Sequence, residues 1–282
     1  MGHLGMRIAI VAPSNRIDQS LVEWVKAIAA AQFGDRPFSQ RPELLFHPQC
    51  FLSSGHFAGT DRERAAAFIE VANDPAVDAV WFARGGYGAG RLLPHIEGAL
   101  APSALEKTYL GYSDAGNMLA LLMKAGVADL AHGPMPTDIR RADGEAALRR
   151  ALAWLVDLDP ETVEPSARNG RPAVAFNLTV LGHLIGTPWQ PDLAGRVLMV
   201  EDVDEYMYRL DRALWQVLSA PGMSRIAGLR LGRCGEIPEN DPDYVLSEVE
   251  MARERCAAAG VAYLGRADIG HDAANKIVPM GG

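Results

Sequence analysis

Ser113 stands at a position where a side chain can act as a nucleophile. It lies in Gly111-Tyr-Ser-Asp114, between a short apolar run that predicts a strand and an apolar-periodic run that predicts a helix. A serine on such a turn lies beside the amide N–H groups at the positive end of the helix. Serine is also a favoured helix N-cap, so a structural role is the alternative. Because residue 115 is alanine, the motif departs from the Gly-x-Ser-x-Gly elbow, which disfavours the α/β-hydrolase fold.

A glycine-rich stretch, Arg84-Gly-Gly-Tyr-Gly-Ala-Gly90, follows another apolar run. Glycines at the carboxyl end of a strand let backbone amides approach a ligand closely. The stretch does not fit the Gly-x-Gly-x-x-Gly dinucleotide motif, because Arg91 stands where the third glycine belongs, and it carries no Walker A lysine. It favours backbone donors for an anion that is not a nucleotide, with a tight turn as the structural alternative.

An acid and a base occur later in the chain. Glu201 directly follows an apolar run and opens an acidic stretch. Acidic residues can also complement a helix N-terminus, an interpretation that fits Asp204 and Glu205 better than Glu201. His271 lies in Gly270-His-Asp272, where an exposed loop histidine is the alternative. A serine, a histidine, a carboxylate and backbone donors together supply every role that acyl transfer requires.

The other histidines and the cysteines do not predict a metal site. His132 ends a further apolar run and either lines the same crevice or turns the chain. The remaining histidines lack His-Glu-x-x-His or other ligand spacing, and the three cysteines form no Cys-x-x-Cys pair. The sequence therefore predicts no metal and no cofactor, and the odd number of cysteines suits a reducing compartment.

Strand and helix patterns alternate along the first half of the chain and predict a parallel, doubly wound sheet. The expected strands are 7–12, 76–83, 108–112 and 127–131, and the expected helices 20–31, 61–73, 114–125 and 146–158. An aperiodic polar stretch follows. Beyond it we expect strands at 174–180, 196–200, 226–231 and 261–264 and helices at 207–218 and 244–259. We therefore expect an N-terminal domain over 1–158, a linker over 159–172 and a C-terminal domain over 173–282.

The composition is that of an ordinary globular protein. The 282 residues are 49% hydrophobic and carry a formal charge of −8, with a pI of about 5.4. This acidic balance argues against a nucleic acid or an anionic membrane as the main partner. No basic segment precedes an apolar one at the start, and no run approaches the roughly 18 apolar residues of a membrane span. We therefore expect a cytoplasmic protein.

Seven short motifs, taken together and in order, resemble the LD-carboxypeptidase family of serine peptidases. This family includes the muramoyl-tetrapeptide carboxypeptidases and the microcin C immunity peptidases. The motifs are Ala12-Pro-Ser14, Arg84-Gly-Gly-Tyr-Gly88, Gly111-Tyr-Ser-Asp114, His132-Gly-Pro134, Asn177-Leu-Thr-Val-Leu181, Val200-Glu-Asp202 with Tyr208-Arg-Leu-Asp211, and Gly270-His271 with Pro279-Met-Gly281. They run through almost the whole chain.

The resemblance implies a role for each candidate residue. Ser113 is implied as the nucleophile, His271 as the general base and Glu201 as the residue that orients the histidine. The backbone N–H groups of Gly86 and Asp114 are implied as the oxyanion hole. We also expect substrate contacts from Arg84, Tyr87, His132 and Asn177.

The same resemblance implies the architecture and the activity. It implies an α/β chain with an N-terminal parallel sheet domain and a smaller C-terminal domain with barrel-like β structure, so that the triad exists only when the domains are docked. The implied activity is release of C-terminal D-Ala from cytoplasmic murein tetrapeptide during cell-wall recycling. We expect a small murein peptide as substrate, a homodimer, and neither nucleic acid nor membrane as a partner.

Two alternatives remain. One is an immunity-type peptidase that cuts the amide of an aminoacyl or peptidyl nucleotide, although such members tend to be longer and carry an aromatic stacking loop. The other is a catalytically inactive ligand-binding protein on the same scaffold. The chain departs from the family at Ala175-Phe176, where a pair of glycines is usual, and at Gly282, where relatives usually continue into another strand. We therefore expect the edge of the second domain to be closed differently.

Overall fold

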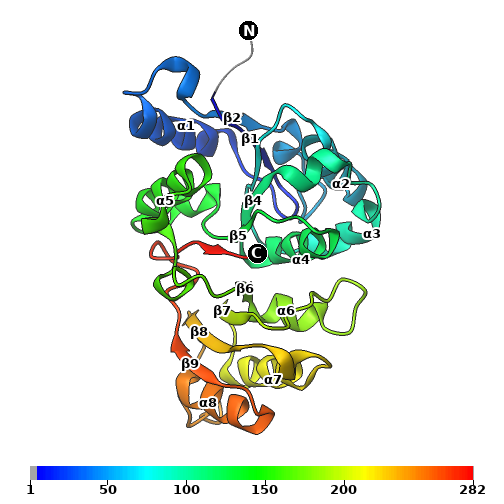
Figure 1. The fold of residues 1–282 in the computed structure, drawn as a ribbon, viewed down its shortest axis with the longest axis vertical. Coiled ribbons are helices and arrows are strands. Elements are labelled where there is room, and N and C mark those ends of the chain that lie inside the picture. Colours follow the sequence, from blue (N-terminus) through cyan, green and yellow to red (C-terminus); the bar gives the residue numbers. More distant parts are fainter. Residues whose placement is uncertain (1–4, 282) are drawn as a thin grey trace.

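The computed structural model of the chain describes residues 5–281 and contains two sheets (Figure 1). The first sheet has the strand order β10-β5-β4-β3-β1-β2, and only β10 runs antiparallel to its neighbour. Its strands are β1 (Arg7–Val11), β2 (Glu43–Phe46), β3 (Ala79–Phe82), β4 (Thr108–Gly111), β5 (Leu130–His132) and β10 (Val278–Pro279). The order reverses between β1 and β3, and parallel α/β sheets bind their ligands at the carboxyl ends of strands beside such a reversal.

Helices cover both faces of the first sheet (Figure 1). They are α1 (Gln19–Phe33) and α5 (Gly144–Asp157) on one face, and α2 (Asp61–Asn73), α3 (Leu93–Ile96) and α4 (Gly116–Ala125) on the other. Successive strand side chains point to opposite faces. Ile10 and Trp81 accordingly pack in the core beneath α1 and α5, whereas Val80 and Phe82 pack in the core beneath α2 and α4.

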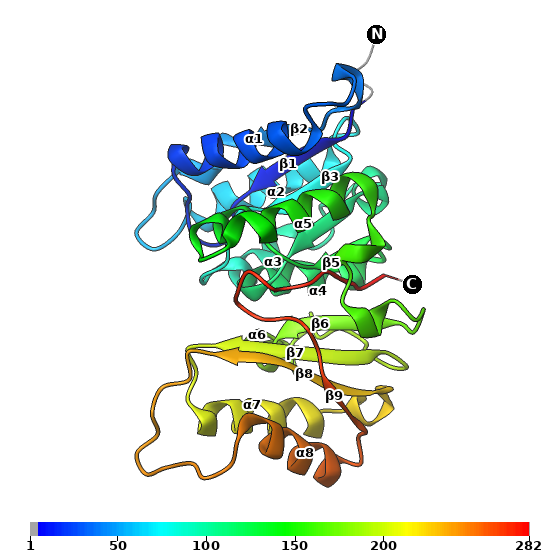
Figure 2. The same ribbon diagram turned by 90° about the vertical axis from the view of Figure 1, so that its left-hand side faces the viewer.

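The second sheet contains four parallel strands in the order β6-β7-β8-β9. Its elements alternate as β6 (Ala173–Asn177), α6 (Leu178–Leu184), β7 (Val197–Val203), α7 (Met207–Ser219), β8 (Gly228–Gly235), α8 (Glu248–Ala259) and β9 (Tyr263–Arg266). Leu198 and Val200 share a core with α6 and α7, whereas Met199 packs on the other face against Ile269 and Val278. Figure 2 shows the part of the chain that follows β9 running along the second sheet toward the first.

The predicted class is confirmed: an α/β chain with an N-terminal parallel sheet and a smaller second part. The second sheet is open rather than barrel-like, because among the described strands β6 and β9 each pair with only one neighbour in it. The predicted strand 174–180 was too long. Asn177 instead accepts the N–H of Val180 at 3.0 Å and thereby starts α6. The predicted helix 244–259 starts later, because Ser247 forms a capping box with Glu250.

The end of the chain returns to the first sheet. Val278 pairs with His132 of β5. The amide of Ile277 donates a hydrogen bond to the carbonyl of residue 162 in the expected linker, and the carbonyl of Ile277 accepts one from the amide of residue 164. The linker itself contains two short 3-10 turns, Pro160–Thr162 and Pro165–Ala167. The division at 159–172 stays a prediction, but the last strand of the expected C-terminal domain belongs to the first sheet. Within residues 5–281, none of the helices is both long and apolar enough to span a bilayer.

Candidate active site

Ser113 lies on a strained turn between β4 and α4. Its φ of 58° is in the left-handed region, which non-glycine residues rarely adopt. The short 3-10 turn Ser113–Ala115 leads directly into α4. Gly85 lies against the hydroxyl, since a Cβ at that position would come within 2.8 Å of the Ser113 Oγ. The backbone therefore holds the hydroxyl at the carboxyl end of the sheet, beside the glycine-rich loop.

Three side chains from distant segments form one hydrogen-bonded row. His271 Nε2 lies 2.9 Å from Ser113 Oγ, and His271 Nδ1 lies 2.5 Å from Glu201 Oε2. Glu201 is fully buried on β7, and His271 lies on the loop that follows β9. The two sheets thus each supply part of the row, and the structure brings together all three residues to which the resemblance assigns a triad.

Burial and the buried carboxylate have opposite effects on His271. Burial lowers the pKa of the imidazole, but the charge of Glu201 and its hydrogen bond outweigh burial and raise this pKa above 6.5. Burial also raises the pKa of Glu201, and the imidazole offsets part of that shift. The ring of Tyr112 covers the imidazole, with the two ring centroids 4.8 Å apart. The His271 side chain is only 7% exposed and that of Glu201 is fully buried, so the pair is shielded from solvent.

The resemblance assigns the oxyanion hole to the backbone amides of Gly86 and Asp114, an assignment that stays a prediction. The first hydrogen bond of the turn after Ser113 is donated by Ala115 to the carbonyl of Tyr112 at 3.1 Å. The amide of Asp114 precedes this donor, so it has no acceptor within the helix. Gly86 has a φ of 118°, and a Cβ there would come within 2.7 Å of the Asn15 side chain. A glycine is therefore required at position 86.

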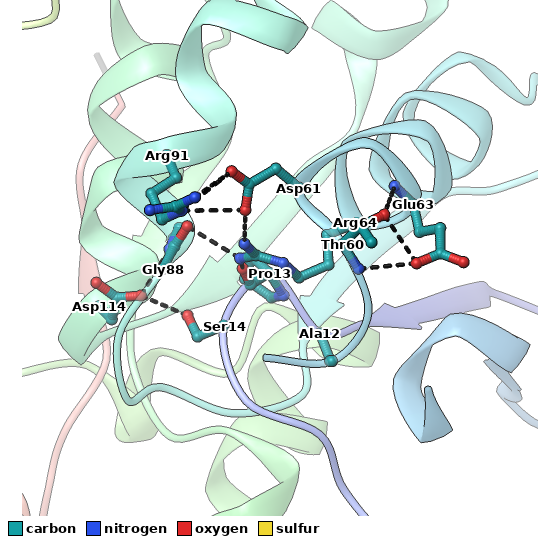
Figure 3. Close-up of polar contacts among 12 residues, drawn as sticks. Ala12, Pro13, Ser14, Thr60, Asp61, Glu63, Arg64, Gly88, Arg91 and Asp114 are labelled. Atoms are coloured by element: carbon teal, nitrogen blue, oxygen red, sulfur yellow. Dashed lines mark hydrogen bonds and ion pairs between the residues drawn. The ribbon is translucent and has the colours of Figure 1, made fainter. Parts of the chain in front are cut away.

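The carboxylate of Asp114 ties together the loops that follow three strands (Figure 3). It accepts hydrogen bonds from the Ser14 hydroxyl at 2.5 Å and from the Ala89 amide at 2.8 Å. Ser14 follows β1, Ala89 follows β3 and Asp114 follows β4. Burial raises the pKa of Asp114, and these donors partly counter the shift. The loop that carries Gly86 is thereby fixed relative to the turn that carries Ser113.

Arg64 of α2 links two of these loops, those that follow β1 and β3. Its guanidinium donates to the carbonyl of Pro13 and, at 2.9 Å, to the carbonyl of Gly88, and it also pairs with Asp61 (Figure 3). Its side chain is fully buried, and burial lowers its pKa. Sequence analysis did not identify Arg64. The available signal was its spacing from Phe68 and Val71, which places a charge on the apolar stripe of α2.

A cavity of about 520 Å³ opens beside Ser113 and His271. Its lining comes from both sheets, with Gly86 on one side and Asp204 on the other. Three arginines, Arg84, Arg140 and Arg141, are also among the lining residues. The cavity next to the serine hydroxyl therefore has a polar lining that contains three arginines and two aspartates, Asp138 and Asp204.

Of the four residues expected to contact substrate, only Arg84 lines this cavity within the described part of the chain. Tyr87 is 59% exposed and lies near His56 and Phe57. His132 is buried beside the ring of Tyr112, and burial lowers its pKa to about 3.

Asn177 is also buried. Its side-chain nitrogen donates to Asp202, and its side-chain oxygen accepts a hydrogen bond at the start of α6. Phe176 beside it is part of the core, and its ring lies 3.4 Å from where a Cβ on Gly116 of α4 would be. The departure from paired glycines at 175 and 176 therefore fills the interface between the two parts.

The acidic stretch divides between two functions. Glu201 faces His271, whereas the next carboxylate, Asp202, accepts hydrogen bonds from the amide and hydroxyl of Thr179 at 3.0 and 2.8 Å. Adjacent residues of a strand point to opposite faces, which explains the division. Asp202 is thus the carboxylate that lies at a helix start, that of α6. The expectation that Asp204 and Glu205 complement a helix N-terminus is wrong, because the first turn of α7 contains no acidic residue.

No group of three or more His, Cys, Asp or Glu side chains in residues 5–281 is arranged to hold a metal ion. The described site residues are instead a hydroxyl, an imidazole, a buried carboxylate and backbone amides. This set can activate a serine for attack on a carbonyl group.

Comparisons with known proteins identify a family for the whole chain. Residues 8–133 match the LD-carboxypeptidase N-terminal domain, and residues 172–282 match the LD-carboxypeptidase C-terminal domain. A putative carboxypeptidase of Synechocystis is 32% identical over 98% of this chain and 90% of its own. The murein tetrapeptide carboxypeptidase of Pseudomonas aeruginosa is 26% identical over 98% and 91%. The crystal structure of muramoyltetrapeptide carboxypeptidase from Oxalobacter formigenes is 26% identical, with a TM-score of 0.79 over 98% and 93% of the two chains. The chain belongs to the LD-carboxypeptidase family.

Proposed function

We propose that this protein is a serine-type LD-carboxypeptidase that releases C-terminal D-Ala from murein tetrapeptide during cell-wall recycling in the cytoplasm. The observation that carries the proposal is the row formed by Ser113, His271 and Glu201 at the wall of the cavity. Membership of the family supports a serine carboxypeptidase, and the names of two relatives support a murein peptide as substrate.

The proposed reaction begins at Ser113. Its Oγ attacks the scissile carbonyl while His271 Nε2 accepts the hydroxyl proton over the 2.9 Å contact. The imidazolium that forms is stabilised by Glu201, which lies 2.5 Å from Nδ1. The negative charge on the carbonyl oxygen is stabilised by the amides of Gly86 and Asp114.

The tetrahedral intermediate then collapses. The bond to the D-Ala nitrogen breaks, and His271 returns its proton to this nitrogen, so D-Ala leaves as an amine. The remaining peptide is an ester of Ser113. Water, activated by the same imidazole, hydrolyses the ester and restores the hydroxyl, and the second product is the shortened peptide with a new carboxylate.

Replacement of Ser113 by alanine tests the proposal. The purified protein is incubated with L-Ala-γ-D-Glu-meso-diaminopimelate-D-Ala, and free D-Ala is measured by mass spectrometry. We expect Ser113→Ala to lower the rate by on the order of 10⁴-fold or more. Ser103→Ala is the matched control, because the Ser103 hydroxyl binds the Asn73 carbonyl instead.

Three outcomes separate the parts of the proposal. Near-wild-type release by Ser113→Ala would exclude the serine mechanism. Equal release of D-Ala and of L-Ala from the epimeric peptide would exclude the stereochemical assignment. Cleavage of an aminoacyl-sulfamoyl nucleotide without release of D-Ala would support the serine mechanism but would show that the substrate is that of an immunity-type peptidase.

A further inference from the structure

The three arginines of the cavity are not equivalent. Arg140 is 46% exposed and pairs with Asp18 in front of α1, so its charge is partly neutralised at the rim. Arg84 donates from Nη1 to the carbonyl of Arg16 at 3.4 Å, a long contact. Arg141 is less exposed, at 34%, and it pairs with a carboxylate that is itself almost completely buried. Arg141 is therefore the best fixed of the three.

That buried carboxylate is Asp138. Its Oδ1 accepts a hydrogen bond from Arg141 Nε at 2.8 Å and another from the Tyr112 hydroxyl at 2.7 Å, and its Oδ2 accepts one from the Met135 amide at 2.8 Å. Tyr112 directly precedes Ser113 in the chain. The guanidinium is thus held at a defined position relative to the reactive hydroxyl.

Arg141 keeps hydrogen-bonding capacity for a ligand. A guanidinium has five N–H donors in a planar fork, and the contacts with Asp138 and Tyr112 use only part of them. Arg141, His271 and Ser113 all line the same cavity. The free part of the fork therefore suits a carboxylate that lies near the scissile bond.

A carboxypeptidase must recognise such a group. The terminal carboxylate belongs to the residue whose nitrogen leaves, so it lies within one residue of the attacked carbonyl, about 4 Å along the chain. Its binding partner must share the cavity with Ser113, as Arg141 does. The lining residues include three arginines and two aspartates, Asp138 and Asp204, although the whole chain has a formal charge of −8.

We propose that Arg141 binds the C-terminal carboxylate of the peptide substrate and that Asp138 positions its guanidinium for this contact. This assignment rests on the proposed exopeptidase function. It makes Arg141 the residue that distinguishes a free chain end from an internal or capped one.

The test uses two peptides that differ only at the chain end. One is the tetrapeptide with its D-Ala carboxylate, and the other carries D-alaninamide in its place. We expect Arg141→Met to lower kcat/KM for the acid by roughly 30- to 1000-fold, mainly through KM, as is usual when a buried charged contact is truncated. The rate on the amide should change only a few-fold, so the preference for the acid should nearly vanish.

Comparison variants make the assignment specific. Arg140→Met should retain the preference for the acid, because Arg140 is engaged with Asp18 at the rim. Arg141→Lys should recover part of the preference, because it retains the charge without the fork. Arg141→Met leaves Asp138 uncompensated, so a double variant with Asp138→Asn removes both partners should the single variant fold poorly.

Binding to Ser113→Ala, measured by calorimetry, separates this inference from the proposed function. The inactive protein should bind the acid more tightly than the amide, and adding Arg141→Met should remove the difference. If the wild type releases no D-Ala, the proposed function is overturned but the role of Arg141 in binding is not. The role of Arg141 is overturned if the acid-to-amide ratio survives Arg141→Met, if Arg84→Met removes it instead, or if neither peptide binds.

Discussion

His271 lies between a hydroxyl and a carboxylate that come from different sheets. Its Nε2 must be unprotonated to accept the proton of Ser113, so activity requires the neutral imidazole. Burial lowers the pKa of His271, but Glu201 outweighs this effect and raises the pKa above 6.5. In the proposed reaction kcat/KM should therefore rise with pH through this raised pKa and reach a plateau above it.

Glu201→Gln tests the origin of that pH dependence. The amide retains the shape but removes the charge that stabilises the imidazolium, and it can favour the wrong tautomer because it is able to donate. We expect kcat to fall by on the order of 10²- to 10⁴-fold, with little change in melting temperature. Burial still lowers the pKa of His271 in this variant, so the acidic limb of the pH profile should move to lower pH.

Glu205→Gln is the matched control, because Glu205 pairs with Arg209 on α7 rather than with the imidazole. Its kcat should remain within a few-fold of the wild type. Equal losses of kcat in the two variants, or an acidic limb that moves upward in Glu201→Gln, would contradict the assignment of Glu201.

At the scale of the elements, the loops around Ser113 depend on a charge buried in α2. Arg64 donates to carbonyls in the loops after β1 and β3, and its side chain is stacked over Phe57, with the guanidinium carbon 4.6 Å from the ring centroid. Loss of the guanidinium would remove the donor to the Pro13 carbonyl, whereas the Gly88 carbonyl would keep the Arg91 amide, which donates to it at 3.2 Å. The glycine-rich loop would then lose one of its fixed points.

Arg64→Met should therefore lower the free energy of unfolding by roughly 1–3 kcal/mol, as measured by urea denaturation. Arg91→Met provides the comparison, because Arg91 binds the same Asp61 from the protein surface, where an ion pair contributes little. We expect its denaturation midpoint to be almost that of the wild type. Similar shifts in the two variants would mean that burial of Arg64 does not matter.

Local signals in the sequence predicted the elements well. The predicted helix 61–73 forms, and a capping box between Thr60 and Glu63, three residues apart, starts it. The strand-to-helix turn at Ser113 was equally readable from neighbouring residues. The function of Arg64 was not, because its acceptors at Pro13 and Gly88 are remote in the sequence. The division of Glu201 and Asp202 between two faces likewise depends on which side of β7 each helix and loop occupies.

At the scale of the molecule, the two sheets share one core. A single cluster of buried apolar residues includes Phe82 and Met118 near the first sheet and Val200 and Leu229 in the second. The return of the chain to β5 adds a covalent path between the sheets. The sequence did not predict this return, because β10 has only two residues and thus no readable period.

This shared core predicts one thermal transition. We expect a single calorimetric peak, with calorimetric and van't Hoff enthalpies that agree. Ile277→Ala truncates a fully buried side chain next to the linker and should lower the free energy of unfolding by roughly 2–5 kcal/mol without splitting the peak. Val245→Ala, at an 84% exposed position, should leave the peak in place. Two resolved transitions would show that the sheets unfold independently.

The late return of the chain also has a consequence during synthesis on the ribosome. About 150 residues separate β5 from the strand that covers its edge, which at 5–20 residues per second takes roughly 7 to 30 seconds to translate. Until then β5 is an open edge to which a neighbouring nascent chain can pair. Ser113 meanwhile has no base, because His271 is made only shortly before the covering strand. The nascent chain thus cannot cleave peptides but can misassemble through the open edge of β5. Translation of the last few residues supplies both the base and the covering strand.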